Sequence, residues 1–145
     1  MPAYIVTCNS CGTANRIPAE KEGKSGRCGN CHRELPPMYC QPQQLTEHTF
    51  DAFVKGYHGP VLAEFWAPWC PHCRSYAPAV RKAAELLAGM AAVVQVNSQE
   101  NPQLAGRFGV NGIPVMFLIN GGRIVAQLEG AQSSEAVVAW FHRHR

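Results

Sequence analysis

The sequence predicts a two-part protein, in which an α/β domain with a mixed sheet between helices follows a smaller lobe that depends on a bound metal ion. Helical and strand-like periodicities alternate from about residue 45 onward, whereas residues 1–40 are rich in Gly and carry two Cys-x-x-Cys pairs. With 145 residues and 46% hydrophobic content, the chain suffices for one packed domain of about 100 residues and a small appendage.

Each element of the α/β domain has its own signal in the sequence. The expected elements are a helix around 50–57, a strand over 61–66, a helix over 70–87, a strand over 91–96, a helix over 102–109, strands over 115–119 and 124–128, and a last helix capped by Ser133 and Ser134. Pro78 predicts a kink in the second helix, and Asn101 is expected to cap the third. Asn120-Gly121-Gly122 predicts a hairpin.

The composition changes near Leu35-Pro36-Pro37, where the Gly- and Cys-rich segment ends. A linker is therefore expected at about 33–44, between a small lobe at 1–40 and the α/β domain at 45–145.

The charges argue against a nucleic-acid-binding surface. The net charge is +3, and basic and acidic residues are interleaved in both halves without a basic stripe. No signal peptide opens the chain, and no apolar run approaches the roughly 18 residues of a membrane span. We therefore expect a soluble monomer of the reducing cytoplasm that binds neither nucleic acid nor membranes. In that compartment, seven cysteines indicate metal ligation and thiol chemistry rather than structural disulfides.

The two N-terminal cysteine pairs predict a zinc-ribbon-like lobe. Cys8 and Cys11 are separated from Cys28 and Cys31 by sixteen residues, within the spacing expected of a four-thiolate site. Four protein ligands leave no open position, so a single zinc ion would be structural and would supply most of the folding free energy of the lobe. Gly12 and Gly29 are expected to provide the tight backbone of these cysteine loops.

Two other interpretations of these cysteines remain open at this stage. The run from Cys28 to His32 matches the Cys-x-x-Cys-His pattern of haem attachment, although that chemistry belongs to exported proteins and leaves the first pair without a role. The four cysteines could also form redox pairs that release zinc on oxidation. We expect zinc, with no haem and no bound organic cofactor.

A third pair, Cys70-Pro71-His72-Cys73, lies where an apolar strand ends and a helix begins. Unpaired backbone N–H groups and the helix dipole favour a thiolate there, so Cys70 is expected to be the nucleophile and Cys73 the resolving thiol. Cys40, near the expected first strand of the domain, is interpreted as a buried inert thiol or as a regulatory one.

Residues 60–145 resemble a thioredoxin. The landmarks occur in the family's order and spacing, and they are Phe65-Trp66-Ala67-Pro68-Trp69-Cys70, Cys73, Pro78, Gly112-Ile113-Pro114, Asn120-Gly121-Gly122 and Gly130. With the four-cysteine segment in front, the whole chain resembles the zinc-containing thioredoxin 2 type. The resemblance implies the thioredoxin fold and a protein-disulfide reductase, which acts on disulfides of client proteins and is recharged by an NADPH-dependent flavin reductase, thioredoxin reductase.

The resemblance also implies roles for individual residues. Trp69 would pack beside the cysteines and form part of the docking surface, and Pro114 matches the family's cis proline. Glu64 occupies the position of the buried aspartate that takes the proton from Cys73. Its apolar strand predicts burial and a raised pKa, the alternative being an exposed carboxylate at a strand edge. Gln95 stands where thioredoxins generally have a lysine, and this loss should keep Glu64 protonated more readily.

The Pro71-His72 dipeptide departs from the family's Gly-Pro and resembles the disulfide oxidant DsbA. An imidazole near the helix start can stabilise the Cys70 thiolate and raise the reduction potential. The span from about −270 mV for thioredoxin to about −120 mV for DsbA equals roughly 7 kcal/mol, and we expect an intermediate value unless His72 is merely a solvated residue. Three functions follow as alternatives: a reductase, a disulfide isomerase or oxidant, and a zinc-linked redox sensor or holdase.

Overall fold

The structure is a computed structural model that describes residues 3–18, 21, 26–35 and 39–145. Pro36 and Pro37 of the expected linker lie outside the described residues. Within the described part, the elements in chain order are β1 (Ala3–Thr7), β2 (Ala14–Pro18), β3 (Gln43–Leu45), α1 (Phe50–Gly56), β4 (Val61–Trp66), α2 (Pro71–Leu87), β5 (Ala92–Asn97), α3 (Pro102–Arg107), β6 (Val115–Asn120), β7 (Arg123–Glu129) and α4 (Ser134–His144).

Five strands form a mixed sheet in the order β3-β5-β4-β6-β7. β3, β5 and β4 run parallel, whereas β6 pairs antiparallel with β4 and β7. The hairpin between β6 and β7 turns at Gly121 and Gly122, whose φ angles of 62° and 79° are those of a two-residue turn with left-handed backbone. This is the mixed sheet flanked by helices that the sequence predicted.

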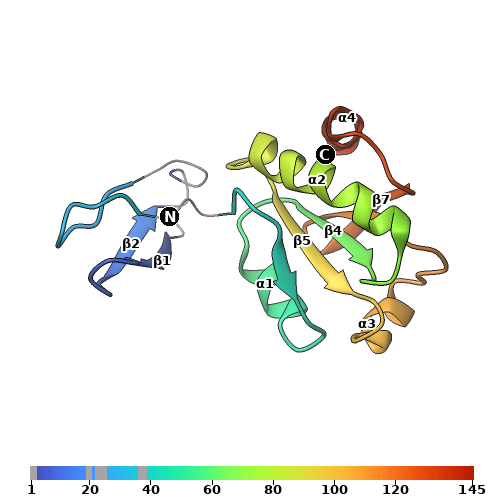
Figure 1. Ribbon diagram of the computed structural model, residues 1–145, viewed down its shortest axis with the longest axis horizontal. Helices are drawn as coiled ribbons and strands as arrows, with labels where there is room; N and C mark the ends of the chain where they lie inside the picture. Colours follow the sequence, from blue (N-terminus) through green and yellow to red (C-terminus); the bar gives the residue numbers. More distant parts are fainter. Residues whose placement is uncertain (1–2, 19–20, 22–25, 36–38) are drawn as a thin grey trace.

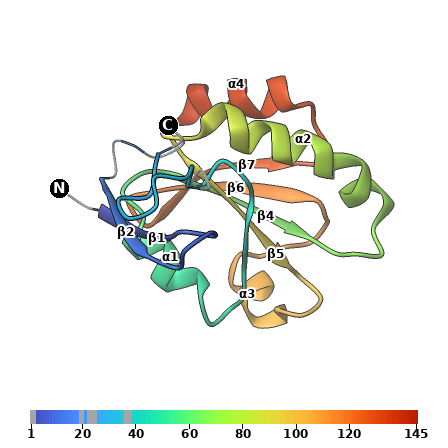
Figure 2. The ribbon, with the colours of Figure 1, turned by 60° about the vertical axis from the view of Figure 1, so that its left-hand side comes forward.

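Helices cover both faces of this sheet. α2 and α4 lie on one face and α1 and α3 on the other (Figure 2). Side chains of β4 alternate between the faces, so that Val61, Ala63 and Phe65 join the apolar layer under α1 and α3. Leu62 belongs to the opposite layer. Glu64, two residues further, therefore points to the α2 side of the sheet.

Two local features differ from what the sequence led us to expect. Gln43 and Gln44, assigned to the linker, pair with β5 as part of β3, a strand too short for a period of two to be recognised. Asn101 is the N-cap residue of α3 and Pro102 the first helical residue, as predicted, but the Asn101 side chain makes no capping hydrogen bond. Instead, Asn101 Oδ1 accepts from the backbone N–H of Glu47 at 2.9 Å, and Nδ2 donates to the carbonyl of Asn97 at 3.0 Å.

The N-terminal lobe contains the antiparallel pair β1 and β2 and lies to one side of the α/β layers (Figure 1). Its apolar cluster is small and consists of Val6, Cys8, Cys28 and Leu35, with Ile17 and Cys31 packed against it. Among the described residues this cluster buries little apolar surface, so a bound metal ion would add to the stability of the lobe. Within the described residues, no helix is both long enough and apolar enough to cross a membrane.

Candidate redox site and metal centre

The Cys70–Cys73 pair lies at the junction between β4 and α2. Cys70 is the N-cap residue of α2, and Pro71 occupies the first helical position, where its missing N–H removes no helical hydrogen bond. This position leaves the Cys70 sulfur close to the unpaired N–H groups of the first turn. The backbone N–H of Cys73 donates to Cys70 Sγ at 3.2 Å.

Both cysteines of this pair are buried thiols, each 4% exposed. Burial is the main cause that raises the pKa of Cys73, to about 12, and the hydrogen bond with Cys70 acts in the same direction. The Sγ of Cys70 lies 3.9 Å from the carbonyl oxygen of Ile113. The site thus holds one sulfur beside helix-end donors and a second whose proton needs an acceptor.

Glu64 lies on β4, on the side of the sheet that α2 covers, and is 1% exposed. Burial raises the pKa of Glu64 to about 7, while the Gln95 amide, donating to Oε1 at 2.6 Å, acts in the opposite direction. The predicted burial and raised pKa are confirmed, and the alternative of an exposed carboxylate is wrong. Glu64 and Cys73 line one cavity of about 270 Å³, so water in that space can carry a proton between them.

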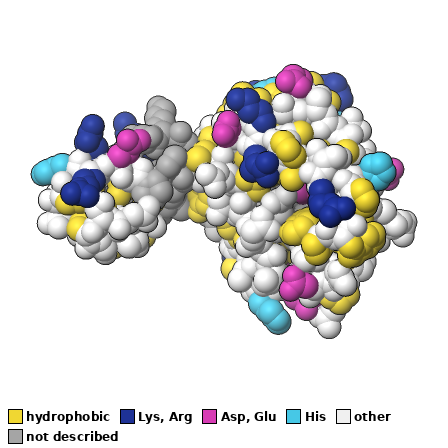
Figure 3. Space-filling view, in the orientation of Figure 1, with side chains coloured by type: hydrophobic (Ala, Val, Ile, Leu, Met, Phe, Trp, Pro, Cys, Tyr) yellow, Lys and Arg dark blue, Asp and Glu magenta, His cyan; other side chains and the backbone are white. Residues whose placement is uncertain are grey.

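The remaining residues expected at this site surround the pair. The Ile113–Pro114 peptide bond is cis, and Ile113 packs against the cluster that contains both cysteines. Trp69 is 63% exposed, and His72 is exposed in the first turn of α2. In Figure 1, α2 begins at the right-hand end of the α/β domain. Figure 3, in the same orientation, shows hydrophobic side chains at this end. An apolar surface therefore surrounds the buried thiols.

The sequence analysis missed two contributors to this site. Ile113 was noted only as part of a family motif, although its carbonyl is the atom opposite Cys70 Sγ. Gln44 was placed in a linker, yet its Nε2 donates to Gln95 Oε1 at 2.5 Å. No local signal could reveal this bond because it joins residues 51 positions apart.

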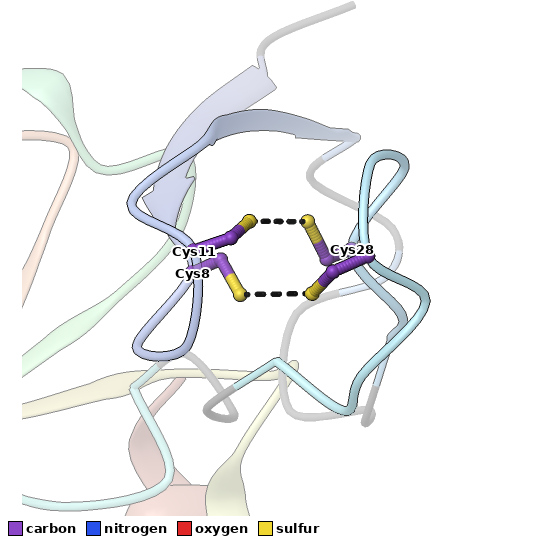
Figure 4. Close-up of side chains that lie close together, drawn as sticks. Cys8, Cys11 and Cys28 are labelled. Atoms are coloured by element: carbon purple, nitrogen blue, oxygen red, sulfur yellow. Dashed lines mark hydrogen bonds between the residues drawn. The ribbon is translucent and has the colours of Figure 1, made fainter.

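A second cluster brings together the four cysteines of the N-terminal lobe, Cys8, Cys11, Cys28 and Cys31, whose sulfur atoms all lie within 4.8 Å of one another. The closest sulfur pairs, Cys8–Cys31 and Cys11–Cys28, are 3.6 Å apart, and Figure 4 shows the two halves of the cluster facing each other. Sulfurs at about 2.3 Å from a tetrahedral zinc ion would be about 3.8 Å apart. The cluster therefore has the size of a site for one zinc ion, reached by movements of at most about 1 Å.

The two cysteine loops have the same backbone structure. The N–H of the residue four positions after the first cysteine donates to that cysteine's carbonyl, at Gly12 and at His32. These two residues have φ angles of 76° and 63°. Left-handed backbone is thus required at Gly12, as predicted, but at His32 in the second loop rather than at Gly29.

Hydrogen bonds support these sulfurs from around the cluster. The N–H groups of Ser10 and Asn30 donate to Cys8 Sγ and Cys28 Sγ, each at 3.4 Å. The Thr13 hydroxyl and backbone, together with the Asn30 amide, lower the pKa of Cys11 to about 5. Such contacts favour the thiolate form that a metal ion requires.

Asn15 connects the two cysteine loops. Its Oδ1 accepts from the N–H of Gly29 at 2.9 Å, and its Nδ2 lies 3.6 Å from Cys28 Sγ and 3.1 Å from the carbonyl oxygen of Thr13. Neither this role nor the residue was expected from the sequence.

The fold and the cysteine pair define a thiol–disulfide oxidoreductase. The family model described as "Thioredoxin" matches residues 41–143, and that described as "Thioredoxin 2, N-terminal" matches residues 7–33. The chain belongs to the thioredoxin family and carries the N-terminal segment of its thioredoxin 2 type.

Individual relatives agree with this assignment. Thioredoxin C-3 from Corynebacterium nephridii is 34% identical over 137 residues, which cover 94% of this chain and 92% of the relative. Thioredoxin 1 from a Nostoc strain is 39% identical over 101 residues, which cover 70% of this chain and 94% of the relative. Among solved structures, a mutant thioredoxin from Halobacterium salinarum matches with a TM-score of 0.66 and 30% identity, covering 73% of this chain and 92% of that one.

Proposed function

We propose that the protein reduces or exchanges disulfides of client proteins, with Cys70 as the nucleophile and Cys73 as the resolving thiol. The observation that carries this proposal is the 3.2 Å contact between the Cys73 N–H and Cys70 Sγ at the start of α2. A helix N-terminus with a donor aimed at the sulfur stabilises a thiolate.

The exchange proceeds in two displacements. The Cys70 thiolate attacks one sulfur of the client disulfide, forming a mixed disulfide and releasing the first client thiolate, which takes up a proton. Cys73 then loses its proton and attacks Cys70 Sγ, which releases the second client thiolate. Two electrons pass to the client, whose disulfide becomes a dithiol, and the Cys70–Cys73 pair becomes a disulfide.

The second displacement requires a proton acceptor. Burial holds the pKa of Cys73 well above its ordinary value, so at neutral pH its thiol has to give up a proton before it can attack. We assign the acceptor role to Glu64, because its pKa of about 7 lets it take up and return a proton near neutral pH. The same group would protonate Cys73 when the protein is recharged.

Clients and the recharging enzyme would use the surface around the cysteines. Trp69 offers an exposed apolar ring, and the residues before Pro114 lie against Cys70, so an extended peptide with a disulfide can approach the sulfur there. The partners proposed are disulfide-containing proteins and an NADPH-dependent thioredoxin reductase, with the protein acting as a monomer in the cytoplasm.

We further propose that His72 raises the reduction potential above that of an ordinary thioredoxin. Its position in the first turn of α2 lets an imidazole favour the Cys70 thiolate and hence the reduced form. A His72→Ala variant should be more negative by about 15–30 mV, a shift near 1 kcal/mol, measured by equilibration in graded glutathione buffers. Equal potentials for the variant and the wild type would refute this role, and a wild-type value above about −200 mV would favour an isomerase or oxidant.

For the N-terminal lobe, we propose one structural zinc ion held by Cys8, Cys11, Cys28 and Cys31. The ion would stabilise the lobe and, with four thiolate ligands, would leave no position open for a substrate. The proposed domains are a zinc-ribbon-like lobe at 1–40 and a thioredoxin domain, expected at 45–145, which we extend at its start to include β3 from Gln43.

The test of the exchange reaction is reduction of insulin disulfides by the zinc-loaded protein with dithiothreitol as the electron source. Cys70→Ser should abolish the catalysed rate. In a separate incubation with insulin but without dithiothreitol, Cys73→Ser should accumulate a mixed disulfide that mass spectrometry detects, because no second thiol resolves it. Cys40→Ser is the matched control and should retain the wild-type rate. Wild-type activity in the Cys70→Ser variant would refute the proposed function.

A further inference from the structure

A chain of three polar side chains runs from the surface to the buried carboxyl of Glu64. Exposed Gln44 on β3 donates through Nε2 to Gln95 Oε1 on β5 at 2.5 Å. Gln95 donates in turn through Nε2 to Glu64 Oε1 on β4 at 2.6 Å. The three strands are neighbours in the sheet, and register places Gln44 beside Gln95 and Gln95 beside Glu64.

When Glu64 is ionised, chemistry fixes the order of donors in this chain. A carboxylate can only accept hydrogen bonds, so the Gln95 end that faces Glu64 must be its NH₂ group. The opposite end of the Gln95 amide is then a carbonyl, which needs a donor, and Gln44 supplies it. Without Gln44, the Gln95 carbonyl would lose this donor, and the bond to Glu64 would have to hold the orientation of the amide.

We propose, on the basis of the exchange reaction proposed above, that Gln44 and Gln95 are positioning residues that engage Glu64 Oε1 and leave Oε2 to carry the proton exchanged with Cys73. The donated bond makes Oε1 the poorer site for a proton. The other oxygen remains available for proton exchange, and Glu64 lines the same cavity of about 270 Å³ as Cys73. The two amides thus determine which carboxyl oxygen acts and at what pH it releases its proton.

The groups around Glu64 are consistent with this assignment. The titratable and charged side chains that α2 places near Glu64 are those of Cys73, Arg74 and Tyr76. Arg74 lines the cavity and is exposed to solvent. The two strands on one side present the neutral amides just described, and β6 places Met116 opposite Glu64. No cation of the sheet faces Glu64 among the described residues, so the amide bond is the contact from the sheet that stabilises its charged form.

The direct test is the titration of the Glu64 side-chain carboxyl by carbon-13 NMR on the reduced, zinc-loaded protein. The Glu64 signal is the one lost in Glu64→Gln. Gln95→Leu should raise its midpoint by about one pH unit or more, since a hydrogen bond to a charged group is removed. Gln44→Leu, a change at an exposed residue that leaves the core intact, should raise the midpoint by about half a unit. Gln95→Lys should lower it, because a cation favours the carboxylate.

Gln43→Leu is the matched control, since Gln43 precedes Gln44 on β3 but donates to the backbone of Gln41. Midpoints that do not move in Gln95→Leu and Gln44→Leu, or that move equally in Gln43→Leu, would overturn the proposal. The pH profile of insulin reduction should follow the NMR midpoints in the same order. Shifted midpoints with a Cys70→Ser variant that still reduces insulin would leave the positioning role standing and refute the exchange reaction instead.

Discussion

Replacement of Glu64 by Gln should stabilise the folded protein in a pH-dependent way. Glu64 is 1% exposed, and its pKa rises from 4.5 in an unfolded chain to about 7 in the folded one. Between these values the folded state binds one proton more than the unfolded state, so stability falls as pH rises. The contribution of the neutral carboxyl is fully present below pH 4.5 and is lost by about pH 7.

The magnitude follows from the difference between the two pKa values. At about 1.4 kcal/mol per pH unit, the change between pH 4.5 and pH 8 amounts to about 3 kcal/mol. Glu64→Gln removes the ionisation while its amide carbonyl can still accept from Gln95. The free energy of unfolding of the variant minus that of the wild type should therefore increase by about 3 kcal/mol between pH 4.5 and pH 8.

Urea denaturation followed by tryptophan fluorescence measures this difference. All three tryptophans, Trp66, Trp69 and Trp140, lie in the α/β domain, so the signal does not report on the metal-dependent lobe. Glu85→Gln is the control, because Glu85 forms a pair with Lys82 in which both side chains are well exposed, and should change stability by less than about 0.5 kcal/mol at either pH. A difference between Glu64→Gln and wild type that stays constant from pH 4.5 to 8 would refute the reasoning.

Two further predictions concern the metal-binding lobe and the last helix. Asn15→Ala should weaken zinc binding about 10- to 100-fold, measured by competition with a chelator, because the link between the cysteine loops is lost. The neighbouring exposed Arg16→Ala should bind zinc as the wild type does, and equal affinities for the two variants would argue against this role. Ser133→Ala should cost about 1 kcal/mol in urea denaturation, since Ser133 Oγ accepts from a first-turn N–H of α4 at 3.1 Å. Ser133→Asp should restore most of this loss, and a loss retained in that variant would point to a cause other than capping.

The sequence by itself determined the features that depend on a few neighbouring residues. The spacing of Cys70 and Cys73 at a strand-to-helix boundary, the four-cysteine pattern of the lobe and the Asn120-Gly121-Gly122 turn are all local. The uninterrupted apolar strand around Glu64 also sufficed to predict its burial and the direction of its pKa. In each case, propensity, periodicity or spacing within one element carries the information.

Only the tertiary structure decided which distant side chains meet. Gln44, Gln95 and Glu64 come from three strands, and a shift of one residue in the register of any of them would turn its side chain to the opposite face of the sheet. Asn101 carries a capping residue's signal, yet its side chain binds the chain before α1. Such contacts depend on strand order and register, which are set by the packing of the whole domain and leave no local pattern in the sequence.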